Sequence, residues 1–247
     1  MSKKRTLKKS ITFFTVFFLL LLGIACIFYV KDYYHSQSTV KNFLKSDNIV
    51  AVTEEKDFIS FTNKIKTSEN AFIFYQGAKV ESTAYAPLLY QLAENGIDCF
   101  LVKMPFHLAV LSPNKANTVL KDYEDKYTNW YIGGHSLGGA MAASYASKNI
   151  SRLKGLILLG AYSTKDLSDT DLFVLSIYGS NDQVLNHEKY ENYKKNLPTS
   201  FSELVLEGGN HAYYGNYGEQ KGDGKADLTR EEQQEKTCDA ILQFIAP

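Results

Sequence analysis

Residues 129–147 read NWYIGGHSLGGAMAASYAS, and they carry the strongest indication of the fold in the sequence. Its first part is an apolar run that ends in glycines, which is typical of a buried strand. Its last part is rich in alanine and predicts a slim helix that packs closely on a sheet. Between them Ser136 has glycines two residues before and two residues after it, and glycine lets neighbouring backbone approach without a Cβ clash. The stretch predicts a sharp strand-to-helix turn that exposes the hydroxyl of Ser136.

Short apolar runs alternate with longer amphipathic stretches on both sides of this turn. Further strands are expected over residues 50–53, 58–61, 71–75, 98–104, 153–160, 171–179 and 202–208. Further helices are expected over about 83–94, 114–126, 187–195 and 229–244, the last opened by a capping box of Thr229 and Glu232. The first two strands are expected to pair antiparallel. The alternation predicts an α/β fold with a mostly parallel central sheet and helices on both faces.

Two residues that can activate a serine follow Ser136 in chain order. Asp182 comes 46 residues later, directly after an expected strand, and His211 comes 29 residues after that, again after a strand. A histidine at that place can act as general base, and an aspartate can hold the imidazole in the required tautomer. We therefore predict Ser136, Asp182 and His211 as a catalytic triad.

Each of the three residues also has a simpler interpretation. A G-x-S-x-G sequence occurs by chance as a plain strand–helix turn, Asp182 would serve as a turn aspartate, and His211 as a surface-loop histidine. Three residues in the required order, each at the carboxyl end of a strand, argue more strongly than any one of them.

Residues 50–245 resemble the α/β-hydrolase superfamily. The similarity is greatest to small, capless bacterial serine hydrolases of the dienelactone-hydrolase-like kind. The segment YQGAKVESTAYAPLLYQLAENGIDCFLVKMPF (75–106) resembles that group's oxyanion loop, first helix and next strand. By this resemblance, backbone N–H groups of Leu137 and of Ala78 or Gly77 would form the oxyanion hole. Gln76 to Lys79 replace the HGGG form of lipases, and serine replaces the cysteine of dienelactone hydrolases, which favours ester over lactone chemistry.

The fold leaves little chain for a cap over the site. Only about ten residues, 161–170, separate two of the expected strands. We therefore expect a minimal cap or none, an open pocket, and an acyl group that is short or reached from solvent.

The amino-terminal region predicts a membrane anchor. Residues 11–30, ITFFTVFFLLLLGIACIFYV, carry no charge, and 20 helical residues span about the 30 Å of a bilayer's hydrocarbon core. Five basic residues precede this run: Lys3, Lys4, Arg5, Lys8 and Lys9. The positive-inside rule then places residues 1–10 in the cytoplasm and the body outside. Cleavage as a signal peptide after Ala25, which would secrete the protein, and lipidation at Cys26 are the alternatives.

The rest of the chain divides into two parts, and its charge limits the partners that it can bind. Residues 31–48 are polar and aperiodic and are expected to form a stalk, and residues 49–247 the hydrolase domain. Beyond the first ten positions the chain holds 22 basic and 27 acidic residues, so its formal charge is about −5. An acidic body without a basic patch argues against nucleic-acid binding.

Several other residues suggest little chemistry of their own. No cofactor is expected, because no glycine-rich dinucleotide motif follows a strand, and no metal, because Cys and His do not cluster. Residues 222–227, GDGKAD, lack the pattern of a calcium loop. Lys79 and His107 are interpreted as loop residues, and His135 as a wedge within the turn. Cys99 and Cys238 are expected to be buried free thiols.

The sequence thus predicts a membrane-anchored serine hydrolase that cleaves a carboxylic ester, small or lipid-like, through an acyl-enzyme. A thioesterase, amidase or acyltransferase acting on an envelope component is the alternative within enzymes. A non-catalytic binding domain that kept the fold is the alternative outside them. Oligomeric state is left open.

Overall fold

The computed structural model describes residues 2–245, with side chains described from residue 12 onward. The chain divides into two compact units, residues 1–33 and 34–247. Helix α1 (Ser2–Lys31) makes up the first unit. The second unit holds the central sheet and the remaining helices.

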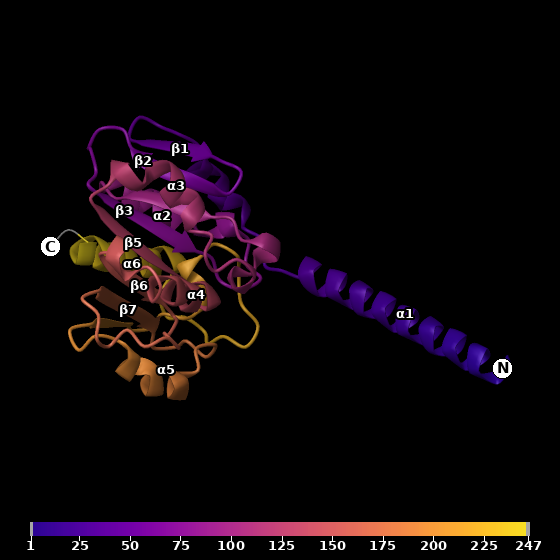
Figure 1. Ribbon diagram of the computed structural model, residues 1–247. Coiled ribbons are helices and arrows are strands. Elements are labelled where there is room, and N and C mark those ends of the chain that lie inside the picture. Colours follow the sequence, from indigo (N-terminus) through magenta and orange to yellow (C-terminus); the bar gives the residue numbers. More distant parts are fainter. Residues whose placement is uncertain (1, 246–247) are drawn as a thin grey trace. The chain divides into compact units, whose positions relative to one another are not determined.

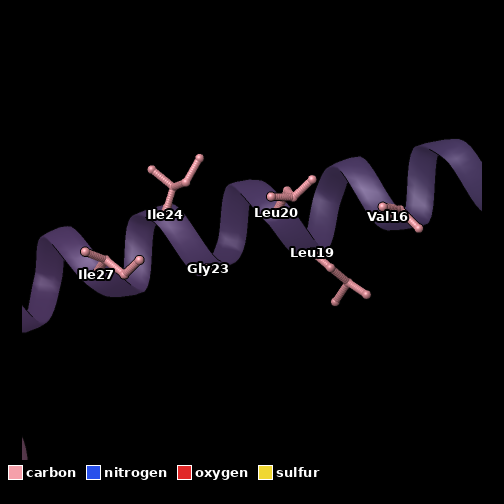
Figure 2. Close-up of a pocket in the computed structure, with 6 residues that line it drawn as sticks. All are labelled: Val16, Leu19, Leu20, Gly23, Ile24 and Ile27. Atoms are coloured by element: carbon pink, nitrogen blue, oxygen red, sulfur yellow. The ribbon is translucent and has the colours of Figure 1, made fainter.

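Helix α1 is long and apolar enough to cross a membrane. Its segment Thr12–Lys31 has 20 residues and a mean hydropathy of 2.7. Because Gly23 has no side chain, it leaves a shallow notch on the helix, which Figure 2 shows bordered only by apolar neighbours: Val16, Leu19, Leu20, Ile24 and Ile27. The expected basic segment, residues 1–10, lies outside the described side chains.

The described part of the second unit contains an eight-stranded sheet in the order β1-β2-β4-β3-β5-β6-β7-β8 (Figure 1). Strands β1 and β2 pair antiparallel, as the sequence predicts, and β2 pairs antiparallel with β4. The other neighbouring strands pair parallel. The strands are β1 (Val50–Glu54), β2 (Phe58–Asn63), β3 (Asn70–Tyr75), β4 (Asp98–Val102), β5 (Asn129–His135), β6 (Gly155–Leu159), β7 (Phe173–Gly179) and β8 (Ser202–Leu206).

Helices cover both faces of this sheet (Figure 1). The α-helices are α2 (Ala86–Glu94), α3 (Asn117–Tyr123), α4 (Leu137–Ala146), α5 (His187–Tyr193) and α6 (Arg230–Ile245). The 3₁₀ helices are η1 (Ser38–Leu44), η2 (Ser82–Tyr85), η3 (Pro105–His107), η4 (Ala109–Leu111), η5 (Glu124–Lys126), η6 (Ile150–Arg152), η7 (Lys194–Asn196) and η8 (Ala212–Tyr214). One buried apolar cluster joins the sheet to α2 and α6, and another joins it to α3 and α4. The α/β fold with a mostly parallel sheet is thereby confirmed.

The central strands β3 and β5 are buried beyond their first residues, Asn70 and Asn129. In β3 the residues from Ala71 to Tyr75 are fully buried. Because helices cover both faces of a parallel sheet, its central strands are buried on both sides and consist of continuous apolar runs. The carboxyl ends of the parallel strands meet at one edge, where the loops after β3, β5, β7 and β8 come together.

No cap covers that edge in the described part of the chain. The segment between β6 and β7, residues 160–172, contains no helix. At the start of α6, Thr229 and Glu232 form the expected capping box: the backbone N–H of Thr229 donates to Glu232 Oε2 at 2.7 Å, and that of Glu232 donates to Thr229 Oγ1 at 3.2 Å.

The segment expected as a free stalk is largely bound to the second unit. Tyr34 forms a parallel β-bridge with Val80, and its N–H donates to the carbonyl of Lys79 at 2.7 Å. Val40, in η1, is only 2% exposed. Phe43 and Leu44 pack against the same buried cluster. Three apolar residues at spacings of three and four on a short helix supply the hydrophobic contact that holds the segment down.

Candidate active site

Ser136 occupies the tip of the turn between β5 and α4. Its backbone has φ 53° and ψ −125°, a conformation that non-glycine residues rarely adopt. Its N–H donates to the carbonyl of Leu159 at 2.9 Å, and its own carbonyl accepts from Ala140 at 3.1 Å. Strain of this kind persists only where the surrounding structure enforces it, and it is common at functional sites.

The glycines around Ser136 are required by close backbone contacts. A Cβ atom on Gly138 would collide with the carbonyl oxygens of Gln76 and Tyr75. A Cβ on Gly134 would meet the carbonyl of Tyr75 and the backbone N of Gly139, the latter at 2.9 Å. The loop after β3 therefore lies directly against the first turn of α4, beside the nucleophile candidate.

Asp182 and His211 are buried and hydrogen-bonded to each other. Nδ1 of His211 donates to Asp182 Oδ2 at 2.7 Å, and the two residues are 1% and 2% exposed. The other carboxylate oxygen, Oδ1, accepts the N–H groups of Val184 and Leu185 at 2.9 and 2.8 Å. A carboxylate fixed by two backbone donors holds the imidazole in one orientation, with Nε2 left as the acceptor.

Ser136 and His211 line the same cleft. It has a volume of about 330 Å³ and a mostly apolar lining: Ser136, Leu137, Ala140, Met141, Gly160, Ala161, Tyr162, Thr164, Val184, Leu185, Asn186 and His211. Among the described residues, Nε2 of His211 has no hydrogen-bond partner, so no bond from Ser136 Oγ is made in this structure. Such bonds are often long without substrate and tighten when it binds.

Gly77 and Ala78, the two candidates in the loop after β3 for an oxyanion-hole N–H donor, differ in their hydrogen bonds. The N–H of Gly77 donates to Tyr85 Oη at 3.1 Å, whereas in the described chain the N–H of Ala78 has no protein partner. Tyr85 is fully buried. Its hydroxyl is also 2.8 Å from Nδ1 of His135; since the hydroxyl oxygen accepts from Gly77, its proton points to that nitrogen.

Gln76 and His107 brace this loop. The Gln76 side chain is fully buried, and its Nε2 donates to the carbonyl of Val80 at 2.6 Å and to Nδ1 of His107 at 3.3 Å. The carbonyl of His107 accepts the N–H of Lys79 at 2.9 Å. Burial lowers the pKa of His107 below its usual 6.5, so the ring favours the neutral form that accepts from Gln76.

His135 is a buried neighbour of His211 in which the neutral form of the ring is favoured. Its ring centroid lies 4.4 Å from that of His211, and the residue is 1% exposed. Burial, and then the charge of His211, lowers the pKa of His135 well below its usual 6.5. Because Tyr85 donates to its Nδ1, His135 is a wedge between the turn at Ser136 and the loop after β3.

Asp223 supports the loop of His211, a role that its sequence did not reveal. Its Oδ1 accepts the N–H of His211 at 3.2 Å, and its Oδ2 accepts that of Ala212 at 2.8 Å. Oδ1 also accepts the N–H of Gln183 at 3.4 Å, so one side chain joins the loops after β7 and β8. The sequence signal was only a glycine-rich acidic stretch.

His187 adds a further contact to the loop after β7 that the sequence did not predict. Its Nε2 donates to the backbone carbonyl of Asp182 at 2.7 Å. Among the described residues no group of Cys, His, Asp and Glu could hold a metal ion. Cys99 and Cys238 are buried free thiols, as expected, and burial raises the pKa of Cys238 to about 12.

A family model of the alpha/beta hydrolase family matches residues 71–235, about two thirds of the chain. The chain belongs to the alpha/beta hydrolase family. The matched region runs from β3 into α6 and includes the turn at Ser136 and the loops of Asp182 and His211. The chain is thus a hydrolase by family.

Solved structures show the same fold. A protein described as a predicted CIB-like hydrolase, from Thermoplasma acidophilum, has a TM-score of 0.60 at 16% identity, over 78% of this chain and 99% of its own. Est1E from Butyrivibrio proteoclasticus has a TM-score of 0.59 at 15% identity, over 81% and 100%. TT1662 from Thermus thermophilus has a TM-score of 0.58 at 12% identity, over 80% and 99%. A search of the curated proteins finds no match to the chain.

Proposed function

We propose that this alpha/beta hydrolase cleaves carboxylic esters through an acyl-enzyme on Ser136. The observation that carries the proposal is the 2.7 Å bond from His211 Nδ1 to Asp182 Oδ2, beside a strained serine in the same cleft. Since Nδ1 carries the proton, Nε2 is free to accept one. That arrangement can activate a serine hydroxyl.

The reaction proceeds in two halves. Ser136 Oγ attacks the ester carbonyl while His211 Nε2 takes its proton, and the imidazolium then gives that proton to the departing alcohol. Water attacks the acyl-enzyme by the same route in reverse order and releases the acid. Asp182 stays ionised throughout and stabilises the imidazolium.

The negative charge on the tetrahedral intermediate needs two N–H donors. Leu137 supplies one at the amino end of α4, where the helix dipole also favours negative charge. Ala78 supplies the other, because the N–H of Gly77 is already bonded to Tyr85. Donors of this kind each lower the barrier by about 2.7–4 kcal/mol.

The size and openness of the cleft favour a small ester over a large ligand that would have to be enclosed. At about 330 Å³ and without a cap in the described chain, it takes a short acyl group, or one end of a longer molecule that stays outside. A thioester or an acyl-transfer acceptor would use the same nucleophile, so the alternatives differ only in leaving group and acceptor.

We further propose that α1 anchors the enzyme in the cell membrane as an uncleaved signal-anchor. The segment Thr12–Lys31 supports this by its length and mean hydropathy. The basic residues before it favour a cytoplasmic amino terminus and a body on the outer face. Removal of the segment as a signal peptide would instead give a secreted enzyme.

The test is hydrolysis of p-nitrophenyl acetate, butyrate and decanoate by the full chain in detergent, beside Ser136→Ala and His211→Ala. The proposal predicts turnover that falls to background in both variants, with the shorter esters preferred. A folded wild type without turnover, or turnover equal in Ser136→Ala, would leave a non-catalytic binding domain as the better account. Amino-terminal sequencing of the protein from membranes tests the anchor.

A further inference from the structure

Three apolar side chains are exposed on one short loop at the active-site edge of the sheet. Phe106, Val110 and Leu111 are 62%, 51% and 56% exposed, and they lie within one span of six residues, 106–111, in the connection that follows β4. We call them the apolar loop. Clustered apolar exposure differs from the scattered single residues of an ordinary surface and marks a contact site.

The backbone holds Phe106 outward at a cost. Phe106 and His107 have φ 52° and 57°, a left-handed conformation that bulky residues avoid. The carbonyl of His107 accepts from Lys79, and its Nδ1 accepts from Gln76, so the strained turn is fixed by bonds to the loop beside the nucleophile. Stability of the fold does not require a strained turn that exposes an aromatic ring, and strain of this kind is common at functional sites.

The apolar loop is also joined to the catalytic machinery. Helix η4, which carries Val110 and Leu111, packs against α4, the helix that begins directly after Ser136. Lys79, which follows the oxyanion donor Ala78, is bonded to His107. Whatever covers this loop therefore lies next to the entrance of the cleft.

The sequence indicates what covers it. Between Asp98 and Asp122 there is no Asp or Glu, although the chain beyond residue 10 has five more acidic than basic residues. The same stretch holds Lys103, Lys115 and Lys121. Lys103 and Lys115 pair with Glu54 and Asp57 of neighbouring segments. The loop between these two lysines, residues 104–114, contains no Asp, Glu, Lys or Arg. An apolar loop without charged side chains suits insertion into a bilayer interface.

The chain's own connectivity brings the membrane to this surface. Only Asp32 and Tyr33 separate the end of α1 from Tyr34, and Tyr34 is bonded to Lys79 and Glu81 in the segment beside the apolar loop. We propose that the apolar loop inserts into the interface of the membrane that holds α1, and that the substrates are acyl esters presented by that bilayer. This inference rests on the proposed hydrolase activity and anchor.

The test uses the full chain in nanodiscs of phosphatidylcholine and phosphatidylglycerol. The variant Phe106→Ser/Val110→Ser/Leu111→Ser is compared with Ile65→Ser, which is 71% exposed in the turn before β3, at the opposite edge of the sheet. The triple variant should keep hydrolysis of soluble p-nitrophenyl acetate within about twofold and lose about tenfold or more on a fluorogenic phospholipid ester in the disc. Ile65→Ser should match the wild type on both. Equal phospholipid hydrolysis by the triple variant would overturn the proposal.

A second measurement does not depend on activity. Tryptophan is introduced as Val110→Trp or Ile65→Trp, and the discs contain lipids brominated near the headgroup. The proposal predicts quenching of Val110→Trp above that of the wild type, with its buried Trp130, and no added quenching of Ile65→Trp. Absence of quenching at residue 110 would contradict membrane contact, whereas absence of turnover with quenching intact would contradict only the hydrolase.

Discussion

The carboxylate of Asp223 accepts the backbone N–H of His211 at 3.2 Å, although the two residues are twelve positions apart and Asp223 touches no reacting group. With Ala212 and Gln183 also donating to it, this carboxylate joins the loop of His211 to the loop of Asp182. The geometry of His211 against Asp182 thus depends on a third segment of the chain.

Replacing Asp223 with Asn should lower kcat about tenfold with little change in KM. The amide has one accepting oxygen in place of two, and its NH₂ group would face N–H donors, so the loop of His211 shifts; a loss of about 1.4 kcal/mol in transition-state stabilisation corresponds to tenfold. Steady-state ester hydrolysis measures it.

The control for that variant is Asp227→Asn. Asp227 lies on the same segment, but its carboxylate accepts from the side chain of Asn181 and not from the backbone around His211. It should keep kcat within about twofold, because exposed hydrogen bonds contribute little. Equal losses in the two variants would mean that Asp223 acts only through general stability of the segment.

Asp182→Asn should reduce kcat by about 10³–10⁴-fold while the protein stays folded. The amide can still accept from Val184 and Leu185, so the loop keeps its bonds. Its NH₂ group, however, would face Nδ1 of His211 and move the imidazole proton to Nε2, where it blocks the general base. Ester hydrolysis and thermal unfolding, measured in the same detergent, separate loss of catalysis from loss of the fold. A drop in melting temperature large enough to explain the lost activity would contradict a role of Asp182 in orienting His211.

Tyr85→Phe should destabilise the fold by about 1–3 kcal/mol, because it leaves the N–H of Gly77 and Nδ1 of His135 without partners in a fully buried place. Hydrolysis should fall as well, since the loop that carries Ala78 loses the hydrogen bond from Gly77 to Tyr85 that holds it in place. Chemical denaturation measures the first effect. A variant with wild-type stability would show that neither bond matters.

Stability should fall as the pH drops below about 6.5, because of His135. Its pKa is lowered in the folded state, so below that pH the unfolded chain binds a proton that the folded chain does not, and acidification favours unfolding. The contribution is fully present above pH 6.5. Melting temperatures between about pH 7.5 and 5.5 should fall less steeply for His135→Asn than for the wild type. Parallel slopes would assign the pH dependence to other groups.

The strands and the turn at Ser136 were predictable because they depend on local pattern. An apolar run such as β3 predicts a buried strand, and the small residues of α4 predict a helix packed closely on the sheet. The capping box of Thr229 and Glu232 involves neighbours three residues apart, so the sequence contains it whole. Strand boundaries differed by at most two residues, and helix boundaries by at most three.

What the sequence did not reveal depends on contacts between distant segments. Tyr34 pairs with Val80 across the chain, and the stalk prediction failed because a polar composition hid the apolar face of η1. The role of Tyr85 depends on a bond to His135, fifty positions away. Asp223 lies in a loop whose course no local pattern fixes.

Covalent labelling of the full chain in detergent by a fluorophosphonate probe, followed by peptide mapping, tests most simply whether Ser136 is an activated nucleophile. We expect one adduct, on Ser136, with labelling abolished in Ser136→Ala and slowed strongly in His211→Ala. A folded wild type that does not react, or an adduct at another serine, would contradict an activated nucleophile at the turn between β5 and α4.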